Sequence, residues 1–329
     1  MDWGDAFSNG LIAAIGPIGA AYAISTIGLN LQFGYTGLLN FGHVAFMMMG
    51  AYGMAATVAA GGSMWLGIAV GIGAAVVLGL LLGIPTLRLR ADYLAITTIA
   101  AAESLRFLIR SPVTRPVTGG VFGIQGFASE FHALNPFGAS ALFHLGPIDI
   151  TGRRLWVMLV GWTLVVVLIL ISRRLIKSPW GRLVRAIRED EDASRSLGKN
   201  VFAVKLQALT RGGALGAMGG ILIAIEQQNV TPDNFLPQLT FILFVVMILG
   251  GTGTIWGPLV GAVVFQFFFF FFDTMMREAQ RNIDWVGAII SSAGAGQMRF
   301  VLVGIALIVL LVFRPQGILG NRKEALIDV

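Results

Sequence analysis

The feature of this sequence that most limits its fold is a series of long apolar runs that recurs from one end to the other. A helix that crosses the hydrocarbon core of a bilayer needs about 20 mainly apolar residues, with a range of roughly 17 to 25. The chain is 56% hydrophobic and only 12% charged, and nine of its segments approach this length. The candidate spans are residues 11–31, 41–60, 65–84, 93–110, 155–172, 205–226, 237–250, 255–272 and 300–313. We therefore predict an all-α, polytopic membrane protein with about nine transmembrane helices, within a range of eight to ten, some of them broken or re-entrant.

Composition excludes several other classes of protein. The chain has no cysteine, and its histidines, His43, His132 and His144, are scattered, so neither a thiolate site nor a local metal cluster is expected. The net charge of +6 would favour nucleic acid only on a domain with a solvent-exposed basic face, and no such domain is visible. We predict no metal and no nucleic acid, and interpret the bases as determinants of topology.

The positions of lysine and arginine predict an orientation, because basic loops resist translocation across the membrane. With nine spans and the N-terminus outside, 15 of the 23 bases fall on the inside, ten of them between residues 173 and 211. This assigns residues 173–204 to a cytoplasmic loop and 111–154 to an extracytoplasmic loop that is glycine-rich and expected to be irregular or partly re-entrant. The C-terminus is then cytoplasmic.

Two stretches place glycine, threonine and polar residues between apolar runs. They are residues 30–46, NLQFGYTGLLNFGHVAF, and residues 250–258, GGTGTIWGP. Irregular backbone at membrane depth survives only where it is buried in protein or lines a wet cavity, and broken segments often mark a substrate path. Ordinary short turns between adjacent helices are the alternative interpretation, and composition alone does not separate the two.

The fourth predicted span carries charged side chains. Glu103 and Arg106 stand three residues apart, so they share a helix face and can pair. A charge inside a membrane segment is a functional candidate by default, although structural pairing is the simpler interpretation here. A lone histidine such as His43 is in the same way more often a residue that hydrogen-bonds between helices.

The most charged part of the chain is SPWGRLVRAIREDEDASRSLGKN, residues 178–200. Ser178 followed by proline predicts the start of a helix, and Gly198 predicts its C-terminal end. We therefore predict a helix of about five turns in this segment. An apolar stripe is expected from Leu183, Val184, Ile187 and Leu197. Bases come first and four acids follow, whereas a helix lying on anionic lipid would prefer bases throughout its polar face. A protein partner explains this order, and a solvated loop is the alternative.

Motifs of covalent chemistry are absent from the sequence. The phosphate-binding pattern G-x-x-x-x-G-K-[ST] is approached only at Gly198-Lys199, without the earlier glycine. There is also no G-x-S-x-G and no H-E-x-x-H pattern. We predict that the chain is not an enzyme, has no catalytic residues and does not hydrolyse ATP.

Six motifs, in order, carry a resemblance to a known family. They are GYTGLLNFGHVAF, LRLRADYLAITTIAAAESLRF, TGGVFGIQGF, SPWGRLVRAIREDEDASRSLGKNVFAVKL, ILGGTGTIWGPLVGA and LVFRPQGILG. Together they resemble the LivM-type permease subunit of branched-chain amino acid ABC importers, over residues 28–320. The resemblance makes 1–329 a single transmembrane permease domain in a bacterial inner membrane. Asn40, where related sequences often have serine, and the six phenylalanines of 267–272 depart from the family pattern.

The resemblance also implies partners and roles. Such a permease pairs with a homologous second permease in the lipid bilayer, above two cytoplasmic ABC ATPases and below an extracytoplasmic solute-binding protein. ATP and magnesium are bound by the ATPases, and this chain binds no cofactor of its own. The central cytoplasmic loop docks on an ATPase, which assigns coupling to Arg182, Arg185, Arg188, Glu189, Asp190, Glu191 and Asp192. The expected function is import of branched-chain or hydrophobic amino acids by alternating access.

For the translocation pathway we name Thr36, Asn40, His43, Glu103 and Thr252 from the two interrupted stretches and the charged span. A permease of a urea or amide ABC importer is an alternative within the same type of transporter. A stand-alone ion-coupled carrier or channel is an alternative from another class. It would need acids inside the membrane, and the sequence offers essentially one.

Overall fold

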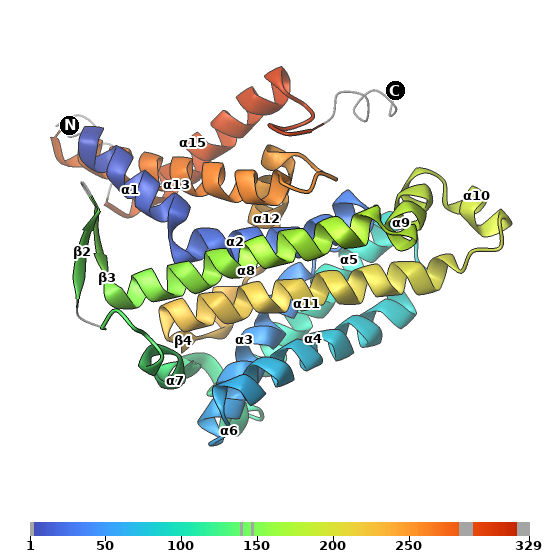
Figure 1. The fold of residues 1–329 in the computed structure, drawn as a ribbon, viewed down its shortest axis with the longest axis horizontal. Coiled ribbons are helices and arrows are strands. Elements are labelled where there is room, and N and C mark those ends of the chain that lie inside the picture. Colours follow the sequence, from blue (N-terminus) through green and yellow to red (C-terminus); the bar gives the residue numbers. More distant parts are fainter. Residues whose placement is uncertain (1–2, 139–140, 146–147, 283–291, 321–329) are drawn as a thin grey trace.

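The computed structural model describes residues 3–138, 141–145, 148–282 and 292–320, and this part of the chain is predominantly helical (Figure 1). The longer helices are α1 (Trp3–Ile15), α2 (Pro17–Leu29), α3 (His43–Ala59), α4 (Met64–Thr86), α5 (Ala91–Arg110), α8 (Gly152–Lys177), α9 (Pro179–Glu189), α11 (Val201–Gln227), α12 (Pro237–Gly250), α13 (Gly257–Asn282) and α15 (Ser292–Phe313). Short helices are η1 (Asn30–Gly34), α6 (Arg115–Thr118), η2 (Gly120–Phe122), α7 (Ser129–Ala133), α10 (Glu191–Ser196) and η3 (Pro232–Phe235). The strands are β1 (Ile124–Gln125), β2 (Leu142–Leu145), β3 (Ile148–Thr151) and β4 (Asn229–Val230).

Four helices of the described chain are long and apolar enough to cross a membrane, namely α4, α8, α11 and α13. A bent pair formed by α1 and the α2–η1 segment would make a fifth, and α3 and α12 are shorter apolar helices. The predicted helical membrane architecture agrees with this arrangement, whereas the number nine is not established by it. Helices α13 and α15 begin or end eight to ten residues beyond the spans predicted at 255–272 and 300–313.

The first predicted span, residues 11–31, is bent and is not one straight helix. The chain forms two helices with a bend of 48° between them. Gly16 separates the helices and is extended, with φ −66° and ψ 171°, and Pro17 starts α2. Proline disfavours the helical conformation of the residue before it and donates no backbone hydrogen bond, so a helix can start at Pro17 but does not run through it.

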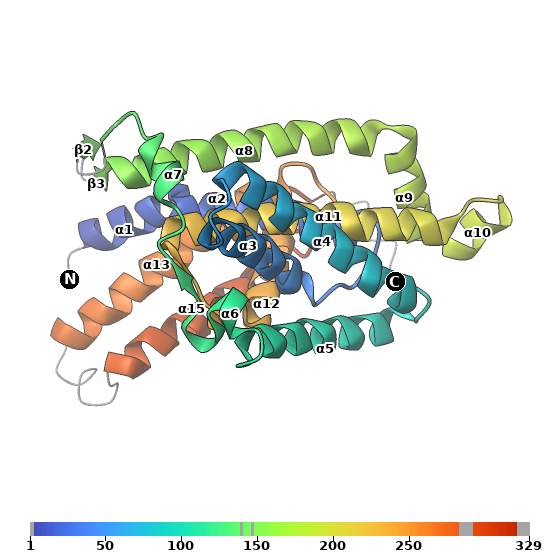
Figure 2. The same ribbon diagram turned by 90° about the horizontal axis from the view of Figure 1, so that it is seen from below.

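The core lies where α2, α3 and α11 pack together. In α11, 72% of its apolar 18-residue segment is buried inside the protein. The corresponding segments of α4, α8 and α13 are only 28% buried, so these helices face outward. Figures 1 and 2 show α11 running through the body of the molecule beside α4 and α8. Small residues allow helices to approach closely in a membrane. A Cβ atom at Gly220 would overlap the carbonyl oxygen of Met47, so the crossing of α3 and α11 requires glycine there.

The described part of the segment predicted as an irregular outer loop, residues 111–154, contains short helices and strands and the first residues of α8. Strands β2 and β3 form an antiparallel pair with Leu142 opposite Thr151, where no strand was expected. Strand β1 pairs with β4 from beyond α11, with Ile124 opposite Val230. In Figure 1 the β2–β3 hairpin and the α9–α10 segment lie at opposite ends of the molecule.

The predicted helix of residues 178–200 is confirmed at its two ends and wrong in its middle. Ser178 Oγ caps α9 by accepting a hydrogen bond from the amide of Gly181, and Gly198 has the positive φ of 73° that ends a helix. Between them the chain breaks at Asp190, which is extended (φ −150°) and whose side chain caps α10. The segment is therefore two helices, α9 and α10, which we call the α9–α10 elbow (residues 179–196).

Candidate functional site

The two interrupted stretches of the sequence meet in the structure. The side chain of Asn30 donates a hydrogen bond to the carbonyl oxygen of Thr254 (2.8 Å) and accepts one from the amide of Gly253 (2.9 Å). Thr254 in turn orders its own turn, because its hydroxyl donates to the carbonyl of Gly251 and accepts from the amide of Gly257. One buried asparagine thus joins the end of α2 to the turn between α12 and α13.

Residues 30–34 form a π-helical turn, η1, rather than a continuation of α2. The amide of Tyr35 donates to the carbonyl oxygen of Asn30, a bond that spans five residues, at 2.9 Å. Single π-helical turns are rare and occur often at functional sites. The polar break expected at this position is therefore present, and it is buried within protein as irregular backbone in a membrane must be.

Gln32 of the π turn and two residues that follow it, Asn40 and His43, form a hydrogen-bonded set that we call the polar node. The amide group of Gln32 donates to the carbonyl of Leu209 on α11 (2.8 Å), and its oxygen accepts from Asn40 Nδ2 (2.9 Å) and lies 3.1 Å from His43 Nδ1. His43 Nε2 lies 3.1 Å from the carbonyl oxygen of Ser25.

All three residues of the polar node are almost fully buried, with exposures of 0–1%. Burying an amide or imidazole without a hydrogen-bond partner destabilises the folded state. Because Gln32 bonds both Asn40 and His43, the node favours one arrangement of α2, α3 and α11. The interpretation of His43 as an interhelical hydrogen-bonding residue is confirmed by these contacts.

The other predicted pathway residues are dispersed. Thr36 is buried, and its hydroxyl donates to the carbonyl of Leu31 at 2.8 Å, close to the node. Thr252 is half-buried in the turn that Asn30 holds, where Gly253 and Thr254 make the hydrogen bonds. The candidate role of these residues in translocation stays a prediction.

Glu103 belongs to a separate cluster of charges. It pairs with Arg106 (2.8 Å), as the three-residue spacing predicted. Arg106 also contacts Asp233 of η3 (3.0 Å), and Asp233 accepts a further bond from Arg110 (2.9 Å). The carboxylates of Glu103 and Asp233 therefore form ion pairs with the guanidinium groups of Arg106 and Arg110. None of these contacts reaches the polar node, so the structure does not unite Glu103 with Asn40 and His43.

Sequence reasoning missed the two amides on which the site depends, Asn30 and Gln32. Their partners, Thr254 and Leu209, lie 224 and 177 residues away in the chain. A signal was available, since both amides stand in the apolar run NLQF. A carboxamide in such a run needs a partner to be buried, but one sequence does not say which.

Helix α9 of the elbow packs against the same π turn. Val184 and Ile187, with exposures of 0% and 3%, join Leu31 and Tyr35 in one apolar cluster, as expected of the predicted stripe. Arg188 Nη1 donates a hydrogen bond to the carbonyl oxygen of Gly34 (2.5 Å), the last residue of η1. The predicted fourth member of the stripe, Leu197, is instead 78% exposed, because the chain turns at Asp190 before reaching it.

The guanidinium of Arg185 lies over the ring of Tyr35, with 5.5 Å between its carbon and the ring centroid. Cation–π contacts of this kind add to the packing of a charged helix on an aromatic residue. The elbow is therefore attached to the π turn by an apolar cluster, one charge-assisted hydrogen bond and one cation–π contact.

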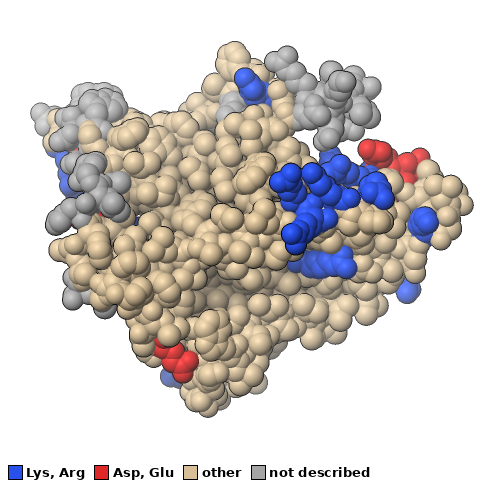
Figure 3. Space-filling model, in the orientation of Figure 1, with Lys and Arg blue, Asp and Glu red and all other residues tan. Residues whose placement is uncertain are grey.

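The opposite face of the elbow carries its remaining charges into solvent. Arg182, Glu189, Asp190 and Asp192 are exposed. Glu191 bonds to Lys205 of α11 and to Arg195 (2.9 Å), and Asp192 bonds to Arg195 (3.1 Å). In Figure 3, lysine and arginine gather at the end of the molecule that carries α9, with acids near the tip. Glu189 has no ion pair within the described part of the chain.

Charged side chains also lie at the end of the molecule opposite the elbow, where α7 and the start of α8 are found (Figure 1). Arg154 lies 3.7 Å from Glu226, and Glu130 accepts a hydrogen bond from the amide of Met64 (2.7 Å). Burial, together with the charge of Arg153, lowers the pKa of His132 in α7. Among the described residues no three His, Asp or Glu side chains are placed to hold a metal ion. His144 lies in β2, and nothing is described of its side chain.

Comparison with known sequences places the chain in a family. A sequence profile described as the branched-chain amino acid transport system / permease component matches residues 12–312. The chain belongs to this family. The resemblance drawn from six motifs is thereby confirmed, and this permease is a multi-pass membrane protein, as its apolar helices also indicate.

Individual relatives of the permease agree with the family assignment. It is 31% identical over 316 residues to the high-affinity branched-chain amino acid transport system permease protein LivM of Escherichia coli K12, covering 93% of this chain and 69% of that protein. It is 24% identical to a probable LivM protein of Methanocaldococcus jannaschii, over 92% and 91% of the two chains. An autoinducer 2 import system permease protein, LsrC of Yersinia enterocolitica, is 25% identical over 78% and 64%. No solved structure matches.

Proposed function

We propose that this permease is the membrane subunit of an ATP-binding-cassette importer that moves branched-chain or other hydrophobic amino acids by alternating access. The observation that carries the mechanism is the contact of α9 with η1. A movement imposed on the elbow reaches the π turn through the hydrogen bond from Arg188 to Gly34. From there it reaches the turn of residues 250–258 through Asn30.

The elbow fits a coupling element because its two faces differ. One face is apolar and anchored on the π turn, and the other presents exposed charges of both signs. A separate ATPase that binds the charged face can therefore pull on the anchored face. This assignment places the elbow and the C-terminus in the cytoplasm and the N-terminus and residues 111–154 outside. It gives the permease a homologous second subunit, two ATPases that bind ATP and magnesium, and an external solute-binding protein.

The pathway is proposed to pass beside the two joined interruptions. Thr36, Asn40, His43 and Thr252 belong to them, whereas Glu103 is held by Arg106. We assign Glu103 the role of positioning Arg106, which contacts Asp233 of η3, and not the role of an ion-coupling acid. A carrier driven by ions would need a free carboxylate in a span, so the pairing of Glu103 favours the ATP-driven importer.

The substrate class follows from the relatives named for branched-chain amino acid transport. The similarity to an autoinducer 2 permease shows that proteins of different substrates share this type of sequence. Uptake of radioactive leucine, urea and autoinducer 2 by the complete complex in proteoliposomes separates these alternatives. Uptake by this chain alone, without ATPases, would contradict the importer.

The mechanism is tested by removing the bond between the elbow and the π turn. In Arg188→Gln, the purified complex is expected to keep its ATPase subunits, because the exposed charges that bind them are intact. Its ATP-driven uptake is expected to fall at least about tenfold, which corresponds to about 1.4 kcal/mol, the scale of one charge-assisted hydrogen bond.

Lys199→Gln serves as the matched control, since Lys199 is exposed and lies between α10 and α11. The same loss of one positive charge there should leave uptake unchanged. Equal uptake by Arg188→Gln and wild type would contradict transmission through Gly34, whatever the substrate proves to be.

A further inference from the structure

The surface of α8 next to the elbow contains a groove that the proposed transport cycle does not use. It has a volume of about 680 Å³ and is lined by Val167, Leu170, Ile171, Arg173, Arg174 and Lys177, with Ser178 at its end. Residues spaced three and four apart lie on one face of a helix, so these side chains form a single stripe along the last turns of α8. The stripe is apolar in its first part and positively charged in its last.

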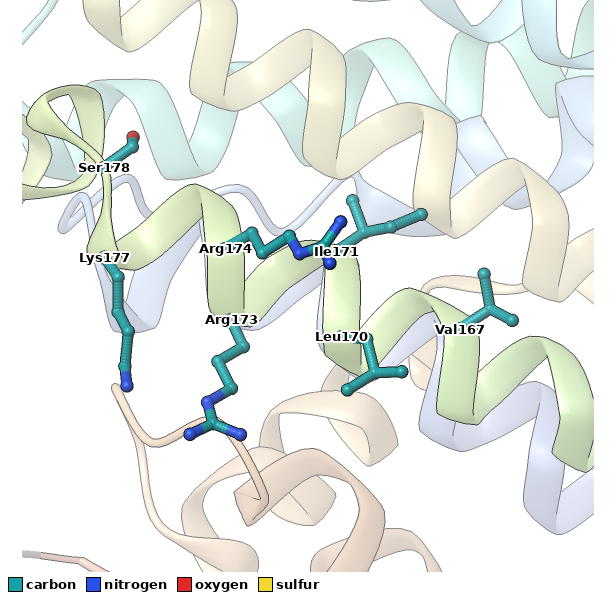
Figure 4. A pocket seen from close by; sticks show the side chains of 7 residues that line it. All are labelled: Val167, Leu170, Ile171, Arg173, Arg174, Lys177 and Ser178. Carbon is teal, nitrogen blue, oxygen red and sulfur yellow. The ribbon is translucent and has the colours of Figure 1, made fainter.

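Within the described residues, the three bases of this groove have no acidic partner. They are exposed, and no ion pair of the described chain involves Arg173, Arg174 or Lys177. This distinguishes them from Arg106, Arg154, Arg195 and Arg277, each of which has a carboxylate within 3.7 Å. Figure 4 shows Arg173 and Lys177 extending to the same side of α8, with Arg174 lying along the helix toward Ile171.

Part of this charge is explained by the helix itself, since bases near a helix C-terminus interact favourably with its dipole. That effect weakens beyond the last turn and does not require an apolar groove beside the bases. Val167, Leu170 and Ile171 are 44–54% exposed on a helix that is long and apolar enough to cross a membrane, so in a membrane they would face hydrocarbon or another protein. The groove therefore joins hydrocarbon to an anion-binding surface at the depth where a membrane ends.

We propose that this groove binds one anionic phospholipid, with its phosphate held by Arg173, Arg174 and Lys177 and an acyl chain lying along Val167, Leu170 and Ile171. Positive charge alone would also suit free phosphate, and an apolar face alone would suit a partner helix. Only a molecule with an anionic head and an apolar tail uses both parts at once. Basic pockets beside transmembrane helices are known to bind acidic lipid headgroups.

The position of the groove links the lipid to the elbow. Ser178 lines the groove and is the residue that caps α9, where its hydroxyl also donates to the carbonyl of Leu175 at 2.6 Å. A phospholipid bound there therefore lies against the corner between α8 and α9, without occupying the charged face of the elbow.

Binding is tested on the full complex in nanodiscs of zwitterionic phosphatidylcholine, by titration with a fluorescent phosphatidylglycerol and with a matched phosphatidylcholine. We expect wild type to bind the anionic probe selectively. Each base near an anionic headgroup contributes about fivefold in affinity, so the triple variant R173Q/R174Q/K177Q should bind on the order of 100-fold more weakly.

A control with the same change in charge is R88Q/R90Q/K199Q, whose three bases are exposed away from the groove. This variant should bind the probe as wild type does. An equal loss of affinity in the two triple variants would overturn the proposal, because it would reflect surface charge only. Unchanged binding by R173Q/R174Q/K177Q would overturn it as well.

The source of the anion and the rival occupant are tested separately. Inorganic phosphate should not displace the fluorescent lipid, whereas Leu170→Trp, which narrows the apolar part without changing charge, should weaken its binding. Displacement by inorganic phosphate, or full binding by Leu170→Trp, would contradict a lipid. Crosslinking from a photoreactive residue at position 171 should label lipid, and labelling of a protein subunit instead would identify the groove as a protein interface.

Discussion

The polar node and the α9–α10 elbow both lie beside the π turn, but their polar side chains have opposite environments. In the node, Gln32, Asn40 and His43 are buried and bond one another and the backbone. In the elbow, most charges are exposed, and Glu189 has no ion pair in the described chain. A buried network fixes one arrangement of helices, whereas exposed charges remain available to a partner. From this difference we infer that the node stabilises the packing of the helices and that the elbow contacts the ATPase.

The largest effect should follow from removing the centre of the node. Gln32→Leu leaves Asn40, His43 and the carbonyl of Leu209 without their bonds to the amide. Each buried group left unpaired costs about 1–3 kcal/mol, so we expect a loss of about 3 kcal/mol in the free energy of unfolding. Thermal unfolding of the purified complex measures it. Gln207→Leu, at an exposed position of α11, should change stability little, and equal melting temperatures of the two variants would contradict a stabilising role of Gln32 in the polar node.

A smaller effect is expected from crowding the node without removing a polar group. A Cβ atom at Gly216 would lie 2.7 Å from Nε2 of His43, closer than a real contact allows. Gly216→Ala should displace the ring from the carbonyl of Ser25 and cost about 2 kcal/mol, within the range for overpacked cores.

The matched control for this crowding is Gly73→Ala on α4, where the new Cβ would meet nothing within 4 Å apart from its own stretch of helix, and helix propensity favours alanine. A melting temperature of Gly216→Ala at or above that of wild type would show that the node can relax, contrary to a rigid network.

The smallest effect on stability should come from the elbow. Glu189→Lys changes an exposed side chain with no ion pair in the described chain, so the free energy of unfolding should stay within about 0.5 kcal/mol of wild type. Association with the ATPases, measured by co-purification, should nevertheless decrease. Glu191→Lys is the informative contrast, because Glu191 pairs with Arg195 and Lys205 and its reversal should lower stability as well. Undiminished ATPase association in both variants would contradict docking on this face.

Much of the fold was predictable because hydropathy and helix caps are local properties. The spans at 41–60, 65–84 and 237–250 match α3, α4 and α12 closely, and Ser178 and Gly198 bound the elbow as predicted. The bend before Pro17 was predictable in principle from the proline, but the apolar run concealed it. The break at Asp190 was hidden because an acidic residue is common both within helices and at their starts.

The candidate site was predictable only in part. Glycines and threonines marked the two interruptions, and His43 was identified as a bonding residue. The two interruptions are joined by the hydrogen bond from Asn30 to Thr254, which lies 224 positions away, and no local pattern encodes such a contact. The same holds for the bond between Arg188 and Gly34, 154 residues apart. Charge and periodicity indicate that a side chain needs a partner, and the packing of the helices decides which one it finds.

The π turn η1 has a geometric consequence for movement. It closes its hydrogen bond across five residues, so it holds one residue more than an α-helical turn would. An α-helix advances about 100° and 1.5 Å per residue. Absorbing or displacing this extra residue would therefore rotate the segment that carries Thr36 and Asn40 by about a quarter of a turn against α2. The hydrogen bond from Arg188 ends on the last residue of that turn, so the elbow is placed to control such a rotation.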